Sequence, residues 1–267
     1  MTSEPTPPTV RVSLDGAVAT VALARPGGMN ALDIATKESL LHALRGVAAD
    51  PAVRCVVLTG DGAAFSVGQD LKEHASLLRE SPGDVWRTVR EHYNPIVELI
   101  DGMDKPVVAA VGGVAAGAGA SFAFAADLRY LSDTAGFTLA FAGVALSCDS
   151  GASWTLPRLI GTAKAKEVMM LGGSIDAAEA WRLGLATEVV PAAELASRVA
   201  EVAEALAAGP TLALGAIRRA VSFSAAAPLA QALEHEAELM DRTGSSSDHT
   251  AAVTAFLAKE TPTFQGR

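Results

Sequence analysis

The chain contains two stretches in which a run of β-branched residues leads through a glycine-rich turn into a helix start. Residues 53–60 lead into 66–70, and residues 106–113 lead into 116–121. A strand that delivers a glycine turn to a helix N-terminus leaves backbone N–H groups unpaired at the positive end of the helix dipole. Two such termini aimed at one point hold an oxygen that becomes negative during a reaction, so the spacing indicates an oxyanion hole. The same glycines also suit tight strand–helix packing, and the residues alone leave both interpretations open.

Other common catalytic and cofactor-binding patterns do not occur in the sequence. Gly117-Ala-Gly119 lacks the third glycine of a dinucleotide-binding fingerprint, and there is neither a phosphate-binding P-loop nor a Gly-x-Ser-x-Gly elbow. The five histidines have no ligand-like spacing and predict no metal site; they are His42, His74, His92, His235 and His249. His74 and His92 are kept as pocket candidates, with solvated or structural roles favoured.

Composition narrows the class of protein. Of the 267 residues, 50% are hydrophobic and 5% are aromatic, which suits a packed core and argues against disorder. The net charge of −9 and the lack of any Lys/Arg run argue against a nucleic-acid partner. Cys55 and Cys148 form neither a disulfide framework nor a zinc pattern, which favours a reducing cytoplasm. Residues 1–9 lack the charged and apolar regions of a signal peptide and are expected to form a flexible tail.

One segment has the length of a membrane span. No charged residue occurs between Lys105 and Asp127, and this distance is sufficient to cross a bilayer. The segment nevertheless opens with Pro106, contains four glycines and consists mostly of small residues. These features favour a buried strand, a turn and a helix, so no membrane span is predicted.

Apolar periodicity predicts the elements that hold the two glycine turns. A hairpin is expected around Asp15-Gly16, and Asp33 is expected to cap a helix. Strands are expected at 53–59, 107–111, 128–131 and near Phe137, and helices at 85–100, at 118–126 and almost throughout from Ser150 onward. This order predicts an α/β core over 10–190 and a C-terminal helical lobe over 191–267. The apolar stripes of the lobe suit an ordinary core and an oligomer interface equally.

Further motifs follow one another along nearly the whole chain after the tail. They comprise Arg25-Pro26 with residues 29–32, and then residues 53–71, 105–119, 126–129, 156–161, 178–185 and 255–259. In this order they resemble the crotonase (enoyl-CoA hydratase/isomerase) superfamily, and most closely its phenylacetate-pathway enoyl-CoA isomerases. The resemblance implies a spiral of ββα units, assembly as a trimer or a dimer of trimers, and an acyl-CoA thioester as ligand. It implies no permanently bound cofactor, since coenzyme A is part of the substrate.

The same resemblance assigns the two donors of the oxyanion hole. They are the backbone N–H groups of Gln69, which follows Gly68, and of Ala118, which follows Gly117. Because both donors belong to the main chain, a side-chain change such as Gln69→Ala is expected to matter little.

The resemblance also implies how coenzyme A is bound. It places Arg25, Val67 and Asp70 near the bent coenzyme A, and it brings Lys259 of a neighbouring subunit toward the phosphates. Lys259 suits equally well the role of a solvated cation at a helix end.

The chain departs from the hydratases of the superfamily at the two positions where those enzymes hold a water between two glutamates. The positions fall on Ser121 and Phe141, neither of which is a carboxylate base, so addition of water by that mechanism is not expected. Asp149 is the acid that remains nearby, and similar isomerases use an Asp at this place as acid–base. The superfamily's 4-chlorobenzoyl-CoA dehalogenase has a nucleophilic Asp at the matching position. The alternative for Asp149 is an N-cap of the helix that runs toward Leu156.

These features favour an enoyl-CoA isomerase. One carboxylate is sufficient to move a proton between two carbons of the acyl chain while the thioester oxygen carries the dienolate charge. Phe141 makes the pocket drier, which raises the pKa of a carboxylate and makes it a better base toward a C–H bond. The alternatives are a hydratase, a dehalogenase-like hydrolase with Phe137, Phe141 and Trp154 around an acyl ring, and a non-catalytic CoA-thioester binder.

Overall fold

The centre of the molecule is a six-stranded sheet with the order β1-β2-β3-β5-β7-β10. The computed structural model describes residues 7–267, so most of the predicted tail lies outside the described residues. The predicted hairpin is present as β1 (Val10–Asp15) and β2 (Val18–Leu23), which pair antiparallel. All other neighbours in this sheet are parallel; they are β3 (Cys55–Gly60), β5 (Val107–Val111), β7 (Leu128–Ser132) and β10 (Glu188–Val190).

A second, smaller sheet carries both glycine turns, and its strands are interleaved along the chain with those of the first. Its strands are β4 (Ala64–Ser66), β6 (Val114–Ala116), β8 (Gly136–Thr138) and β9 (Ser174–Asp176), in that order. The chain passes from β3 to β4, from β5 to β6 and from β7 to β8, which is the predicted succession of ββα units. Because β4 and β6 are parallel neighbours, the turns that follow them lie at the same edge of this sheet.

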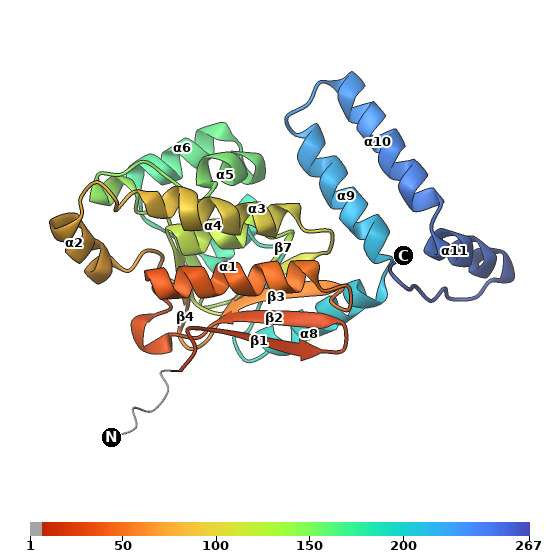
Figure 1. Ribbon diagram of the computed structural model, residues 1–267, viewed down its shortest axis with the longest axis horizontal. Coiled ribbons are helices and arrows are strands. Elements are labelled where there is room, and N and C mark those ends of the chain that lie inside the picture. Colours follow the sequence, from red (N-terminus) through yellow and green to blue (C-terminus); the bar gives the residue numbers. More distant parts are fainter. Residues whose placement is uncertain (1–6) are drawn as a thin grey trace.

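Helices cover both faces of the large sheet (Figure 1). On one face, Val56 and Leu58 belong to the main core together with α1 (Ile34–Ala49), α3 (Asn94–Gly102), α4 (Ala118–Ala125) and α5 (Ala152–Ile160). On the other face, Cys55 and Val57 pack against α8 (Leu195–Ala208). The alternation follows from the strand period of two, and it buries this part of the sheet on both sides.

The uncharged segment after Lys105 is strand, turn and helix, as predicted. It forms β5, β6 and α4, and every residue of α4 is buried. Asp33 caps α1 as predicted, since its carboxylate accepts the Thr36 N–H at 2.8 Å. The apolar character of the segment therefore reflects its place in the protein core.

The single helix predicted over 85–100 is interrupted in the structure. A π-helical turn, Val89–Tyr93, precedes α3, which begins at Asn94. Pro95 lies in the first turn of α3, where its missing N–H is tolerated, but it cannot continue a regular helix from the preceding turn. The predicted stripe is nevertheless buried at Tyr93 and Ile96.

The region from Ser150 onward is less uniformly helical than predicted. It contains the three-residue strands β9 and β10 between α6 (Thr162–Leu171), α7 (Ala177–Leu183) and α8. Strands this short show no alternation of apolar and polar residues, which explains why they were missed.

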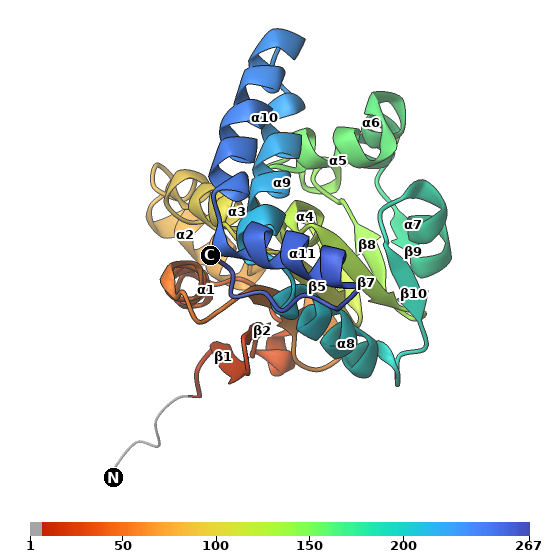
Figure 2. The same cartoon turned by 90° about the vertical axis from the view of Figure 1, so that its right-hand side faces the viewer.

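The last three helices extend away from the sheet, as Figures 1 and 2 show. They are α9 (Thr211–Ser224), α10 (Leu229–Gly244) and α11 (Ser247–Ala258). Arg54 joins them to the sheet by donating to Thr211 Oγ1 at 2.8 Å and to the Phe264 carbonyl at 3.0 Å. Within residues 7–267 no single helix is both long enough and apolar enough to cross a membrane. Helices α8 and α9 meet these two criteria only when they are counted together, and they are bent by 102° relative to each other.

Asp248 at the start of α11 fastens the end of the chain. Its carboxylate, 3% exposed as a residue, accepts the N–H groups of Gln265 at 2.6 Å and Gly266 at 2.8 Å. We expect Asp248→Ala to lower the free energy of unfolding by about 1–3 kcal/mol, since two amides lose their acceptor. Urea unfolding and limited trypsin digestion at the tail measure this. The control is Asp241→Ala on the exposed face of α10, which should leave the free energy of unfolding and the rate of digestion unchanged. Equal effects of the two variants would show that the hydrogen bonds of Asp248 do not hold the end of the chain.

Candidate active site

The two glycine turns touch each other. A methyl group on Gly68 would lie 2.8 Å from the Ala116 carbonyl oxygen and 3.3 Å from the Ala118 nitrogen, and one on Gly119 would lie 2.5 Å from the Ser66 carbonyl oxygen. Gly68 also has a φ of +78°, which side-chain-bearing residues rarely adopt. Glycine is therefore required here both for the backbone conformation and for the close approach of the turns.

The N–H of Gln69 is directed away from the rest of its own turn. The Gly68 carbonyl accepts the Leu32 N–H at 2.8 Å, and the Asp70 N–H donates to the Leu32 carbonyl at 3.1 Å. In a trans peptide the C=O and N–H point in opposite directions, so the Gln69 N–H points away from Leu32. Within residues 7–267 this N–H has no hydrogen-bond acceptor.

The N–H of Ala118 is free for a corresponding reason. Ala118 is the first residue of α4, and the carbonyl of Gly117 accepts both the Ser121 N–H and the Ser121 hydroxyl at 3.1 Å. The Ala118 N–H therefore points out of the helix N-terminus, where no acceptor lies in the described part of the chain. Two free amides on adjoining turns are the arrangement that binds an oxyanion.

Ser121 and Phe141 occupy the two positions at which the sequence lacks a carboxylate, and they differ in burial. Ser121 is fully buried, with its hydroxyl on the Gly117 carbonyl, so it fixes the peptide that carries the Ala118 N–H. Phe141 is half-buried and packs against the main core. Neither side chain offers a carboxylate that would hold a water.

Asp149 lies in the loop before α5 and is half-buried. Burial raises the pKa of its carboxyl group, opposed by the hydrogen bond from the Ser150 hydroxyl at 2.9 Å and by the positive charge of Lys37. Two side chains donate to the Gln69 side chain, Lys37 and Tyr93. Burial lowers the pKa of Lys37 and raises that of Tyr93, and the negative charge of Asp149 opposes the first shift and adds to the second. The carboxylate thus acts electrostatically on the two side chains that hold Gln69.

The alternative role of Asp149 as a helix cap is wrong. Gly151, with a φ of +74°, is the residue from which α5 begins, and no side chain caps this helix. Asp149 contributes only its main-chain carbonyl, which accepts the Ala152 N–H at 3.0 Å. Its carboxylate therefore makes no capping hydrogen bond.

The residues predicted to contact coenzyme A, apart from Lys259, lie together beside the Gln69 turn. Arg25 donates to Asp70 at 2.8 Å and to the Ala31 carbonyl at 2.9 Å, and the Val67 N–H donates to the Met29 carbonyl at 3.2 Å. The hydrogen bond from Arg25 lowers the pKa of Asp70. This ion pair keeps both groups charged at the edge of the turn.

Lys259 is not brought to this place within one chain. It is the exposed residue that ends α11, with a φ of +62°. In Figure 1, α11 lies at the opposite end of the molecule from α2 (Leu71–Glu80), which starts immediately after the Gln69 turn. Any contact with the site would have to come from a second chain, as the resemblance implied.

Two features of the site were not recognised in the sequence. Asn30 is fully buried and donates to the carbonyls of Asp61 at 3.0 Å and Ala64 at 2.7 Å, which fixes the loop before β4. Lys37 and Tyr93 hold the Gln69 side chain. The signal for Lys37 was its spacing of three and seven residues from Leu40 and Leu44, which places it on the buried stripe of α1.

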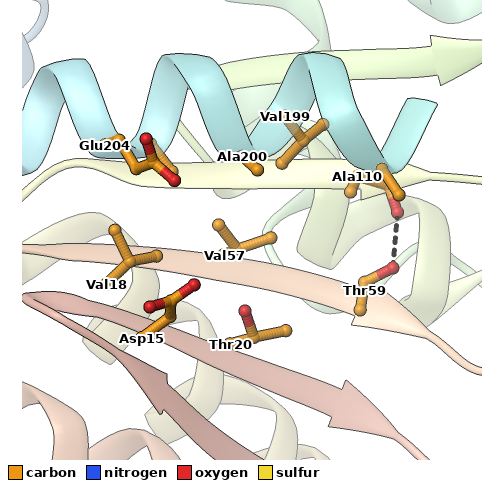
Figure 3. A pocket seen from close by; sticks show the side chains of 11 residues that line it. Asp15, Val18, Thr20, Val57, Thr59, Ala110, Val199, Ala200 and Glu204 are labelled. Atoms are coloured by element: carbon orange, nitrogen blue, oxygen red, sulfur yellow. Dashed lines mark hydrogen bonds between the residues drawn. The ribbon is translucent and has the colours of Figure 1, made fainter. Parts of the chain in front are cut away.

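A separate cavity of about 220 Å³ lies between α8 and the outer face of the large sheet (Figure 3). Its walls are mainly apolar or small, and the only hydrogen bond drawn among its lining residues joins Thr59 Oγ1 to the Ala110 carbonyl at 3.0 Å. The cavity lies on the α8 face of the sheet, whereas Ala118 belongs to the core on the other face. It is not part of the candidate site.

Comparison with known proteins identifies the family of the chain. The sequence model of the Enoyl-CoA hydratase/isomerase family matches residues 13–267. The chain is 36% identical to the 1,2-epoxyphenylacetyl-CoA isomerase of Escherichia coli over 94% of this chain and 95% of that protein. It is 38% identical to an enoyl-CoA hydratase, assigned as probable, of Rhodobacter capsulatus, over 97% and 98%. A solved structure from Mycobacterium abscessus, assigned to the enoyl-CoA hydratase/isomerases, superposes with a TM-score of 0.93 at 46% identity, over 97% and 100%. The chain therefore belongs to the enoyl-CoA hydratase/isomerase family and has the crotonase fold.

Proposed function

We propose that the protein is an enoyl-CoA isomerase that moves a double bond within an acyl-CoA thioester. The observation that carries the proposal is one half-buried carboxylate of raised pKa, Asp149, whose charge acts on the Lys37 and Tyr93 side chains that hold Gln69, the residue with the free backbone N–H. Ser121 and Phe141 occupy the two positions at which the resemblance to hydratases would require the glutamates that hold a water. Asp149 is therefore the one carboxylate of this set. The relative named as 1,2-epoxyphenylacetyl-CoA isomerase supports isomerisation of an acyl-CoA thioester as the general type of reaction.

The proposed mechanism needs one base and two donors. The thioester carbonyl oxygen accepts the N–H groups of Gln69 and Ala118, which stabilise the dienolate that forms when a proton is removed. Asp149 takes that proton from one carbon and returns it two carbons along the chain, so no group is consumed. Hydration would need a positioned water, but the Ser121 hydroxyl is occupied by the Gly117 carbonyl and Phe141 is apolar.

We propose that coenzyme A enters as part of the substrate and that no cofactor is permanently bound. Arg25 supports this assignment because its guanidinium lies at the edge of the Gln69 turn with 32% of the side chain exposed. Val67 and Asp70 would flank the same part of the ligand.

Both cysteines are free thiols, which suits a reducing compartment such as the cytoplasm.

A panel of 2-enoyl-, 3-enoyl- and aryl-CoA thioesters, followed by mass spectrometry and ultraviolet absorption, tests the reaction class. A shift of the double bond at constant mass is the result that we expect. A gain of water would identify a hydratase, and loss of halide from a halogenated aryl-CoA would identify a dehalogenase. Binding without turnover would identify a CoA-thioester binding protein, and each of these three results would refute the isomerase.

The rate should depend on pH through Asp149. A base works only when it is ionised, and burial raises the pKa of this carboxyl group. We therefore expect kcat/KM for isomerisation to fall as the pH drops through a value above the ordinary aspartate pKa of about 3.9. The pH profile of kcat/KM on a 3-enoyl-CoA measures it. An acid limb at the ordinary value, or none, would contradict the assignment of Asp149 as base.

We propose that the protein assembles as a trimer or a dimer of trimers. The supporting observation is a set of exposed large apolar side chains on the last three helices, which closed symmetric assembly would bury; they are Ile217, Val221, Leu229, Phe256 and Leu257. Multi-angle light scattering should give about three or six times the protomer mass of 27.2 kDa. A monodisperse monomer at micromolar concentration would contradict this assembly.

A further inference from the structure

Lys37 is a buried lysine directly behind the Gln69 turn, and the proposed proton transfer does not use it. It lies in the first turns of α1 and is fully buried. Its Nζ donates to Gln69 Oε1 at 3.2 Å and to Thr88 Oγ1 at 2.7 Å, both of which are neutral acceptors. Burial lowers the pKa of the ammonium group. An apolar residue would avoid the cost of burying a charge, so the hydrogen bonds are what the lysine contributes here.

The Gln69 side chain is held from two elements at once. Gln69 Oε1 accepts the Lys37 ammonium from α1 and the Tyr93 hydroxyl from the π-helical turn. Tyr93 is itself 2% exposed, and the Lys37 Nζ lies 5.3 Å from the centroid of its ring. Thr88 in turn contacts His92 Nδ1 at 3.1 Å, which continues the network toward the surface. The side-chain carboxamide of Gln69 is thus fixed by the Lys37 ammonium and the Tyr93 hydroxyl, which belong to two of the most buried polar side chains in the described part of the protein.

The main chain of Gln69 is held on a third side by Leu32, whose N–H and carbonyl bond the peptide groups on either side of it. With the side chain and both flanking peptides anchored, the direction of the Gln69 N–H is set by its neighbours. We infer that Lys37 is a positioning residue, which acts through Gln69 Oε1 to aim the Gln69 N–H at the thioester oxygen. The inference rests on the proposed function only in the identity of that oxygen. It predicts that the Gln69 side chain matters, which is the opposite of the expectation from the sequence.

The titratable groups that surround Lys37 come from four elements. They are Asp33 at the start of α1, Asp70 and Glu73 at the start of α2, His92 in the π-helical turn, and Asp149 in the loop before α5. None of them forms an ion pair with Lys37 in the described part of the chain, whereas Gln69 bonds it directly. The orientation of Gln69 is therefore the property that loss of Lys37 should change first.

A double-mutant cycle tests whether Lys37 acts through the Gln69 side chain. We expect Lys37→Met to lower kcat for thioester turnover by about 10²-fold, the cost of a misplaced catalytic group, with little change in KM. Gln69→Leu keeps the N–H and should lower kcat similarly. The double variant should lose no more than the worse single variant, because both changes remove one interaction. Multiplicative losses would overturn the inference.

Lys105→Met is the matched control, because Lys105 is also buried and donates to the carbonyls of Val47 and Asp50 at the other end of α1. It should lower the unfolding midpoint and leave kcat unchanged. If Lys37→Met does not fold, Tyr93→Phe removes the other donor to Gln69 Oε1 and should also lower kcat with KM retained. A folded Tyr93→Phe variant with wild-type kcat would then overturn the inference.

Absorption of a bound probe separates this inference from the reaction class. A conjugated arylacryloyl-CoA thioester absorbs at longer wavelength when hydrogen bonds polarise its carbonyl group. We expect a red shift on the wild-type protein, a smaller shift on Lys37→Met, and the full shift on Lys105→Met. A wild-type shift without isomerisation of any enoyl-CoA would refute the proposed function and leave the inference supported. A full shift on Lys37→Met, or none on the wild type, would overturn the inference.

Discussion

Asp149→Asn should lower the rate of double-bond isomerisation by about 10²–10⁴-fold, the usual contribution of general acid–base catalysis. Asparagine has the same shape and accepts the Ser150 hydroxyl, but it cannot take a proton from carbon. Folding and binding of the thioester should therefore survive. Steady-state kinetics on a 3-enoyl-CoA measure the rate, and solvent deuterium should enter substrate recovered from the wild type but not from the variant.

The same substitution at Asp176 is the control. Asp176 caps α7 by accepting the Glu179 N–H at 2.8 Å, and asparagine caps a helix equally well. Asp176→Asn should isomerise and exchange deuterium at wild-type rates. If Asp149→Asn did the same, Asp149 would not be the base.

Ala118→Pro should lower the rate by about 10²–10³-fold, the cost of losing one donor from an oxyanion hole. Proline has no N–H, and at the first position of a helix it is tolerated by the backbone. The variant is therefore expected to fold while lacking one of the two donors. Circular dichroism checks folding, and kcat on the best thioester of the panel measures the loss.

Ala177→Pro supplies the comparison, since Ala177 is the first residue of α7 just as Ala118 is the first of α4. The residue before it, Asp176, has the extended conformation that proline requires. Ala177→Pro should keep wild-type kcat. A folded Ala118→Pro variant with normal turnover would show that the oxyanion donor lies elsewhere.

The two glycine turns were predictable because glycine has a local signature. A β-branched run followed by Gly68 or Gly117 specifies the strand, the turn and the free N–H without any knowledge of distant contacts. That the turns touch could not be read from the spacing, since it depends on β4 and β6 being parallel neighbours. The resemblance to the crotonase superfamily implied that the two turns meet. In the structure they meet where Gly68 approaches Ala116 and Ala118.

The parts that were missed depend on tertiary contacts. Asp-Ser-Gly before a helix is good capping chemistry. The N-cap of α5 is nevertheless Gly151, which has a positive φ and lies two residues after Asp149, so the carboxylate is left for other contacts. Lys37 is separated from Gln69 by 32 residues and from Thr88 by 51, so no local pattern joins them. A lysine on an otherwise apolar helix stripe is a usable signal, and it indicates that a partner must exist without naming it.

The contact between the two turns also bears on how such a site changes during evolution. The separation of the donors is set by main-chain packing around Gly68 and Gly119, with the peptide of Gly117 held by Ser121. The groups that we propose decide the fate of a bound thioester, at positions 141 and 149, lie on a different loop of the chain. Substitution on that loop can exchange one reaction for another while the means of stabilising an enolate is inherited unchanged. The architecture thus separates a fixed half of the chemistry from a half that is free to diverge.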